Sequence, residues 1–300
     1  MKLLLFGKNG QVGWELQRSL AVLGDVVALD RSSREHCGDL ANFDGLARTV
    51  REVRPDVIVN AAAYTAVDKA ESEPEQAHIV NAEAPKELAQ EAQKLGAWLV
   101  HYSTDYVFDG SGSRPWLETD PPAPLSVYGR TKLEGERAIA EHCERHLILR
   151  TSWLYSARGG NFIRTMLRLA QEREKLTVID DQYGAPTSAE LLADVTALAI
   201  YRLAGGACRE TQVTGVYHLA AAGQTTWHGY ASHVLAQARL VQPQIDIKAT
   251  EIAPVTTEAF VTAARRPRNS RLDTAKIRSA FGLSLPPWQQ GVDRVLAEIL

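Results

Sequence analysis

The chain has 300 residues, of which 45% are hydrophobic and 23% charged, with a formal net charge of −3. This length is enough for a large α/β domain and a smaller lobe. The balanced charge, without runs of Lys or Arg, excludes nucleic acid as an expected partner. No apolar stretch approaches the ~20 residues of a membrane helix, and the first residues indicate a strand rather than a signal peptide, so we expect a cytoplasmic protein with no membrane partner.

The N-terminal segment combines an apolar strand with a glycine-rich loop. Residues 2–6 form a continuous apolar run, as expected for a strand buried on both faces of a parallel sheet. Gly7, Gly10 and Gly13 follow, and residues 14–23 carry leucines at helical spacing. Strand, loop and helix in this order place backbone N–H groups and a positive helix end where a pyrophosphate can bind. The spacing differs from Gly-x-Gly-x-x-Gly, so alone it is a weak signal.

A second apolar run, residues 25–30, ends in a carboxylate. Asp30 lies where a dinucleotide site places its ribose partner, although an Asp at a strand end is more often a cap. Arg31 can bind the 2′-phosphate of NADP, which the Asp30 carboxylate repels. Asp30 and Arg31 together therefore do not decide whether the cofactor is NADH or NADPH.

Strand and helix patterns then alternate. Residues 55–62, 98–103 and 147–150 are predicted strands, and residues 77–95 a predicted helix. We therefore expect a Rossmann-type doubly wound parallel sheet over residues 1–150.

After this domain the alternation loosens, with short strands at 177–180 and 215–219. We expect residues 151–300 to be mainly a smaller α/β substrate-binding lobe, with some segments returning to the first domain. No linker separates the halves, so we expect an extensive shared interface.

Tyr128 and Lys132 form a Tyr-x-x-x-Lys motif on a predicted helix, which places both side chains on one side. The pKa of a free tyrosine is near 10, and a nearby ammonium or the cation of an oxidised nicotinamide lowers it. Lys132 can also bind a cofactor ribose. Thr104, at the end of strand 98–103, offers a hydroxyl that can bind a substrate carbonyl oxygen. The motif is common by chance, but with the glycine loop it favours a nicotinamide enzyme.

Longer blocks resemble a known family. Residues 103–110 are similar to the catalytic Ser/Thr strand of the extended short-chain dehydrogenase/reductases, and Tyr128 and Lys132 to their catalytic pair. The resemblance covers essentially the whole chain and is closest for the members that act on a dTDP-linked 4-keto sugar. Its other blocks are residues 7–14, 60–71, 150–153, 181–187 and 264–270.

The resemblance implies hydride transfer from NADPH or NADH to C4 of dTDP-4-dehydro-β-L-rhamnose, giving dTDP-β-L-rhamnose for polysaccharides such as the O-antigen. Tyr128 would donate the proton to the forming alkoxide, tuned by Thr104 and Lys132. The implied cofactor contacts are Gly7, Gly10, Gln11, Val12, Gly13, Asp30, Arg31, Asp39, Leu40, Ala62, Ala63, Tyr64, Thr65, Tyr128 and Lys132. The implied sugar contacts are Val67, Thr104, Asp105, Tyr106 and Trp153.

The one dense basic cluster contains Arg265, Arg266, Arg268 and Asn269. Such clusters are usually solvated turns, but a guanidinium suits the diphosphate of a dTDP-sugar. Because related enzymes have this segment near the nucleotide, we assign Arg265 and Asn269 to substrate binding.

The resemblance also implies a structural Mg²⁺ between subunits, held by Glu15, Glu190 and Glu298. No spacing in the sequence indicates this site, and exposed glutamates are usually solvated. The ion would favour a homodimer.

Two alternatives remain. A relative of this family is a non-catalytic regulatory subunit of methionine adenosyltransferase that keeps the fold and the nucleotide, and the intact Thr104, Tyr128 and Lys132 rank this reading lower. The other is a nucleotide-sugar epimerase or dehydratase. A dehydratase requires an Asp-Glu pair after the threonine, whereas Asp105 is followed by Tyr106.

Overall fold

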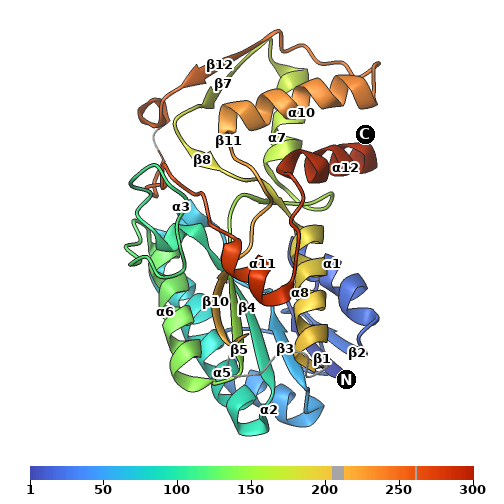
Figure 1. Cartoon of the computed structure of the whole chain (residues 1–300), viewed down its shortest axis with the longest axis vertical. Helices are drawn as coiled ribbons and strands as arrows, with labels where there is room; N and C mark the ends of the chain where they lie inside the picture. Colours follow the sequence, from blue (N-terminus) through green and yellow to red (C-terminus); the bar gives the residue numbers. More distant parts are fainter. Residues whose placement is uncertain (205–212, 261) are drawn as a thin grey trace.

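The protein has two lobes, seen one above the other in Figure 1. The computed structural model describes residues 1–204, 213–260 and 262–300. The lower lobe contains a six-stranded sheet with the order β10-β5-β4-β3-β1-β2, in which all neighbours pair in parallel. Its strands are β1 (Lys2–Phe6), β2 (Asp25–Leu29), β3 (Val57–Asn60), β4 (Trp98–Thr104), β5 (His146–Thr151) and β10 (Gly215–His218).

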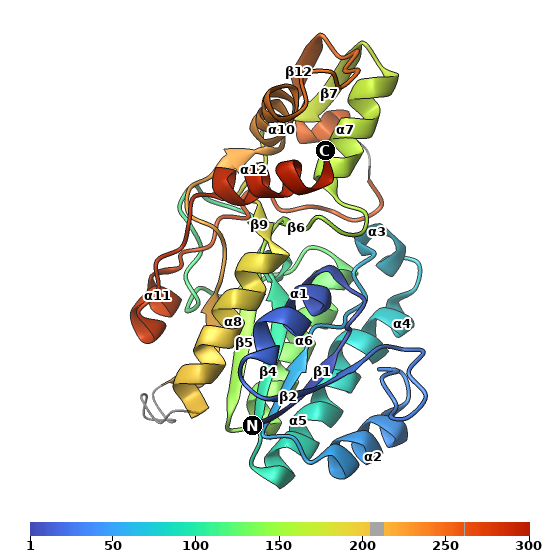
Figure 2. The ribbon, with the colours of Figure 1, turned by 90° about the vertical axis from the view of Figure 1, so that its right-hand side faces the viewer.

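Helices cover both faces of this sheet (Figure 2). Leu3 and Leu5 of β1 face one layer and Leu4 and Phe6 the other, which explains the continuous apolar run. The first layer consists of α1 (Gln11–Ala21), α8 (Ala189–Ala204) and α11 (Ala275–Phe281). The second consists of α2 (Phe43–Val53), α5 (Ala84–Leu95) and α6 (Val127–His142).

The strand order reverses between β1 and β3. From β1 the chain moves outward to β2 and then returns to β3 on the other side of β1. In doubly wound sheets ligands bind beyond the carboxyl ends of the strands at this switch point. Gly7 and Ala61 follow β1 and β3 there, so the glycine loop lies where the fold places a ligand.

Two expected elements differ in the structure. Residues 77–95 are not one helix: α4 (Pro74–His78) leads into a π-helical turn, η1 (Ile79–Glu83), and then into α5. The turn directs Asn81 inward, where its amide bonds both the N–H and the C=O of Tyr64. The strand predicted at residues 215–219 ends at His218, and it pairs with β5 in the main sheet.

The upper lobe has its own core around Tyr230 and Val292. It contains α7 (Phe162–Glu172), α10 (Trp227–Val241), α12 (Trp288–Ile299) and the parallel pair β7 (Lys175–Ile179) and β12 (Glu251–Val255). Two smaller pairs are β6 (Leu154–Tyr155) with β9 (Thr187–Ser188), and β8 (Tyr183–Gly184) with β11 (Thr225–Thr226). The structure shows no helix in its described part that is long and apolar enough to cross a membrane.

Candidate active site

The glycine loop is packed too tightly for side chains. A Cβ on Gly7, whose φ is +88°, would lie 2.8 Å from the nitrogen of Ala62, and a Cβ on Gly13 would lie 2.0 Å from the oxygen of Gly7. Helix α1 begins after Gly10 without a side-chain cap. Its first N–H groups therefore suit an anion, and this cradle fits the pyrophosphate of a dinucleotide.

Gln11 and Val12 begin α1 in different environments. Val12 is buried in the core, so only its backbone remains for a ligand. The side-chain oxygen of Gln11 accepts a hydrogen bond from Ser156 of the upper lobe at 3.1 Å. The loop is thus held from both lobes.

Asp30 lies at the carboxyl end of β2 in a ring of donors. Ser32 donates to it through N–H and hydroxyl at 2.9 Å each, and the Asn9 amide donates to the other carboxylate oxygen. The Ser32 hydroxyl is the main cause that lowers the pKa of Asp30. Lys8 approaches it to 3.9 Å. A carboxylate held ionised in this way suits ribose hydroxyls, and Lys8, Asn9 and Ser32 were not selected from the sequence.

Arg31 extends into solvent beside this ring and has 84% of its side chain exposed. Its nearest described ion partner is Asp39, at 3.6 Å. Leu40 is buried in the core under α2. Arg31 can therefore turn toward a 2′-phosphate at little cost.

The loop after β3 faces the glycine loop. Ala62, Ala63 and Tyr64 are partly buried and Thr65 is exposed. The Tyr64 hydroxyl donates to Glu73 at 2.7 Å, and Asn60 accepts from the N–H of Ala62 at 3.2 Å. Short α3 (Val67–Ala70) follows, with Val67 partly buried.

Tyr128 lies in the first turn of α6. Ser126 caps this helix by accepting from the N–H of Gly129 at 3.1 Å, which fixes where the phenol leaves the backbone. Burial raises the pKa of Tyr128 to about 12, and a hydrogen bond with Thr104 partly offsets this effect. Our expectation of a lowered pKa was wrong for the chain by itself. Lys132 is not among the groups that shift this pKa, and Tyr128 keeps its proton at neutral pH.

Lys132 is 1% exposed, which is exceptional for a lysine. Its ammonium nitrogen lies 2.6 Å from the backbone oxygen of Tyr102 and 3.0 Å from Nε2 of His101. Burial lowers the pKa of Lys132 to about 8, and Glu136 one turn later on α6 raises it.

Thr104 and Asp105 close β4. The Thr104 hydroxyl donates to Asp105 at 3.1 Å and accepts from the N–H of Tyr106 at 3.2 Å. Burial raises the pKa of Asp105 to about 7, whereas hydrogen bonds from Ser270 and Thr104 lower it. Within the described residues, Oδ2 of Asp105 has no hydrogen-bond partner. The ring of Tyr106 meets that of Tyr128 edge-on, with centroids 5.7 Å apart.

Trp153 follows β5 with φ of +49°, a conformation that costs energy for a large residue. Its ring stacks on Trp227 with centroids 3.8 Å apart, and a Cβ on Gly184 would lie 2.5 Å from it. Backbone strain of this kind is concentrated at functional sites. The half-buried indole is held at the boundary of the two lobes.

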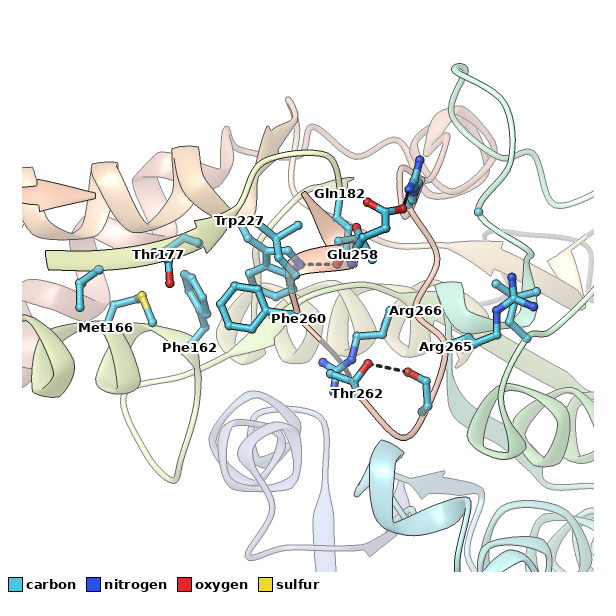
Figure 3. Close-up of a pocket in the computed structure, with 18 of the residues that line it drawn as sticks. Phe162, Met166, Thr177, Gln182, Trp227, Glu258, Phe260, Thr262, Arg265 and Arg266 are labelled. Carbon is cyan, nitrogen blue, oxygen red and sulfur yellow. Dashed lines mark hydrogen bonds and ion pairs between the residues drawn. The ribbon is translucent and has the colours of Figure 1, made fainter. Parts of the chain in front are cut away.

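A cavity of about 1100 Å³ lies in the upper lobe (Figure 3). Figure 3 shows Phe162, Trp227 and Phe260 close together, with Arg265 and Arg266 toward the other end. The lining does not include Thr104, Tyr128 or Lys132. It borders the segments that carry them through residues 109–111, after β4, and Leu125, before α6.

The basic cluster divides into paired and exposed groups. Arg266 binds Asp68 of α3 at 2.6 Å, and Arg268 pairs with Glu258 and, at 3.7 Å, with Asp181. Arg265 is exposed at the cavity rim, and no described residue forms an ion pair with it.

Asn269 is 2% exposed, and its amide donates to the backbone oxygens of Ser111 and Arg114 at 3.3 and 2.8 Å. The side-chain oxygen of Asn269 accepts from Arg271. These contacts hold the loop at the cavity mouth. Of the two assigned contacts, Arg265 is placed to meet a ligand directly, and Asn269 shapes the wall.

Glu15, Glu190 and Glu298 lie close enough to influence one another. Burial raises the pKa of Glu190, Arg294 at 3.1 Å lowers it, and Glu15 and Glu298 raise it further. No group of three or more potential ligands in the described chain could hold a metal ion. A site shared between two subunits therefore stays a prediction.

The comparisons with known proteins agree with this geometry. A family model described as the RmlD substrate binding domain matches residues 1–300. A dTDP-4-dehydrorhamnose reductase of Shigella flexneri is 58% identical over 299 residues, covering 100% of this chain and 98% of the relative. The chain belongs to the dTDP-4-dehydrorhamnose reductase family. The resemblance inferred from the motifs is thereby confirmed.

Solved structures of the family also match. The dTDP-4-dehydrorhamnose reductase of Clostridium acetobutylicum has a TM-score of 0.88 at 34% identity, covering 100% of this chain and 99% of that one. The enzyme of Bacillus anthracis, solved in complex with NADP, has a TM-score of 0.86 at 34% identity, covering 99% of each chain. The Rossmann-type α/β fold expected from the sequence is confirmed.

Proposed function

We propose that this chain reduces the C4 keto group of dTDP-4-dehydro-β-L-rhamnose to give dTDP-β-L-rhamnose, the activity for which its relatives are named. The observation that carries the proposal is the hydrogen bond between Thr104 and Tyr128 at the end of β4, with Lys132 on the same helix as Tyr128 and bonded to the backbone of β4, in a fold that also has a glycine cradle. NADPH or NADH, held by the glycine loop and Asp30, supplies the hydride when bound.

The side chains of the chain handle the proton. Tyr128, whose pKa is about 12, holds a phenolic proton at neutral pH and gives it to the oxygen forming at C4. Thr104, already bonded to Tyr128, orients the phenol and the substrate oxygen. Lys132, whose ammonium is fixed by Tyr102 and His101, would hold the ribose of the cofactor with its remaining donor. These roles require no metal.

The cavity of the upper lobe suits the nucleotide part of the substrate. Its aromatic end offers faces on which a thymine base can stack. The exposed guanidinium of Arg265 offers a forked donor for the diphosphate. We assign the sugar to Val67, Asp105, Tyr106 and Trp153. The assignment is supported by the bond of Asp105 to Thr104 and by the edge-on contact of Tyr106 with Tyr128.

The preference between NADPH and NADH is inferred from the groups around the Asp30 carboxylate. Arg31 is free to turn, and Lys8 and Ser32 add donors that suit a 2′-phosphate. We therefore assign NADPH as the preferred cofactor, with NADH accepted.

We also assign a homodimer with a structural Mg²⁺ at Glu15, Glu190 and Glu298. Burial is the main cause that raises the pKa of Glu190, and Glu15 and Glu298 raise it further against the effect of Arg294. This nearness of the three carboxylates supports the assignment. Metal analysis and sedimentation before and after chelator treatment test the assignment. If the protein holds no magnesium, or if its oligomeric state does not change when the chelator is added, the Mg²⁺ assignment is wrong.

The deciding experiment mixes the purified protein with dTDP-4-dehydrorhamnose and NADPH or NADH. We expect one molecule of reduced cofactor to be oxidised for each molecule of dTDP-rhamnose formed. The absorbance of the reduced cofactor measures its oxidation, and analysis of the sugar product measures the dTDP-rhamnose. Bound nucleotide without turnover would instead indicate the non-catalytic regulatory class. Cofactor that stays bound through purification and is regenerated would indicate an epimerase.

A further inference from the structure

A buried chain of polar side chains lies behind Lys132. Nε2 of His101 is 3.0 Å from the lysine nitrogen, and Nδ1 of the same ring is 3.1 Å from the amide nitrogen of Asn60. Asn60, His101 and Lys132 are each at most 1% exposed. Polar groups buried this deeply cost stability unless they bond one another, so their alignment is a specific feature of the site.

The contacts of Lys132 fix its direction. An ammonium has three N–H donors. One points to the backbone oxygen of Tyr102 at 2.6 Å, and a second to Nε2 of His101. With two donors held at fixed acceptors, the direction of the third is set, and this is the donor that remains for a cofactor ribose.

We propose that His101 is a positioning residue for the reaction, which accepts a hydrogen bond from Lys132 at Nε2 and is itself oriented by Asn60. The proposal rests on the reductase function given above. His101 touches neither substrate nor cofactor in this scheme, and it acts only through the lysine.

The protons of this chain can be assigned. Burial and the charge of Lys132 lower the pKa of His101 well below its ordinary value, so the ring stays neutral. A cationic Lys132 can be met only by an unprotonated Nε2, which leaves the ring proton on Nδ1. In the structure the amide nitrogen of Asn60 faces Nδ1, so in this state the amide turns over to present its oxygen and gives up the bond that this oxygen accepts from the N–H of Ala62.

A neutral amine reverses the pattern. Nε2–H of His101 then donates to Lys132, and the Asn60 amide donates to Nδ1 while its oxygen accepts the N–H of Ala62 at 3.2 Å. The ring can thus meet both protonation states of the lysine in one position, while the Asn60 amide turns between them.

Other charged groups near Lys132 are already paired or lie on its active-site side. Glu136 of α6 is held by two hydrogen bonds to Arg150 of β5, at 2.6 and 2.8 Å. Tyr128 and Asp105 lie toward the substrate. The charged groups of the bordering α3, α4 and α5 bind elsewhere: Asp68 to Arg266, His78 to Glu134, and Glu91 to Arg51. Among the described residues, His101 is therefore the side-chain acceptor of the ammonium, beside the backbone oxygen of Tyr102.

Removal of this acceptor shifts the pH dependence of turnover. Without it the buried ammonium is less stable, and Lys132 loses its proton at lower pH. We expect His101→Leu to move the alkaline limb of the kcat profile down by about one pH unit, as loss of one hydrogen bond to a charged group would.

Two further variants isolate the hydrogen bond from the packing. His101→Gln places an amide oxygen near the position of Nε2. We expect the alkaline limb of its kcat profile to lie close to that of the wild type. His146→Leu is the matched control, because His146 is a buried histidine of neighbouring β5 whose ring bonds the oxygen of Cys143. We expect this control to leave the limb unchanged. A His101→Leu limb that coincides with the wild-type limb overturns the proposal.

A measurement on the wild type tests the same assignment without relying on a variant that folds. In ¹⁵N-histidine NMR spectra below the pKa of Lys132, we expect His101 to be neutral with an unprotonated, hydrogen-bonded Nε2. An imidazolium, or a proton on Nε2, at slightly acidic pH would contradict the proposal. Failure of the wild type to reduce the dTDP-sugar would count against the function alone, since this spectrum needs no turnover.

Discussion

The base of the active site and the cavity of the upper lobe are built in opposite ways. Lys132 and His101 are at most 1% exposed and have hydrogen-bond partners at fixed distances. At the cavity, Arg265 is exposed and Phe260 is 42% exposed. The groups proposed for the chemistry are buried and hydrogen-bonded, whereas groups proposed for recognition are exposed. Changes at the base should therefore alter kcat, and changes at the cavity should alter KM.

The largest effect is expected at the base. Tyr128→Phe removes the phenolic proton and little volume, so kcat should fall by about 10²- to 10⁴-fold, the usual contribution of a general acid. Fluorescence titration should give an unchanged Kd for NADPH. An active Tyr128→Phe enzyme would rule out this proton donor.

A substitution at the cavity is expected to have a smaller effect, and to change KM rather than kcat. Arg265→Ala removes the exposed guanidinium, and KM for the dTDP-sugar should rise about tenfold with little change in kcat, since a hydrogen bond to a charged group is lost. Arg168→Ala is the control, because Arg168 pairs with Glu172 on α7 outside the cavity lining. Equal effects of the two substitutions would place the diphosphate elsewhere.

Asp105 connects the two regions, since it bonds Thr104 and Ser270. Its pKa rises from 3.8 to about 7, so between these values the unfolded chain releases a proton that the folded chain keeps. Stability contributed by this group falls as pH rises through that window and levels off above it. Asp105→Asn should therefore raise Tm by a few degrees at pH 8 and by less at pH 5, as calorimetry can check. An equal gain at both pH values would show that Asp105 ionises normally.

The smallest effect is expected at Arg31, which is exposed at the surface. Arg31→Ala should lower kcat/KM for NADPH by about 3- to 10-fold and leave the value for NADH unchanged, because the 2′-phosphate is the only part that differs. If kcat/KM fell equally for NADPH and NADH, Arg31 would instead act by holding the groups around the Asp30 carboxylate in place.

The residues at the base of the active site could be predicted from the sequence because most of them lie close together along the chain. Tyr128 and Lys132 are one helical turn apart, and Gly7 to Gly13 lie in one loop. Thr104 was found because strands of a parallel sheet end at the same edge. These residues follow from the spacing rules of helices and strands.

The cavity could not be found in this way. Its lining comes from distant segments, between Asp109 and Arg268, that no spacing relates. Arg265 and Asn269 look alike as parts of a polar turn, and only packing shows that one is exposed and the other buried. His101 was included in a predicted strand, but a histidine in an apolar run does not reveal which side chain it meets.

The sheet is completed by segments from late in the chain, and this has a consequence during synthesis. A ribosome releases β1 to β5 long before α8, β10 and α11. Until then the layer that buries Leu3, Leu5 and Val100 has α1 but lacks α8 and α11, and β5 has an open edge. The half-made chain is therefore prone to aggregation, and a fragment ending at residue 150 will not serve as an independent nucleotide-binding domain.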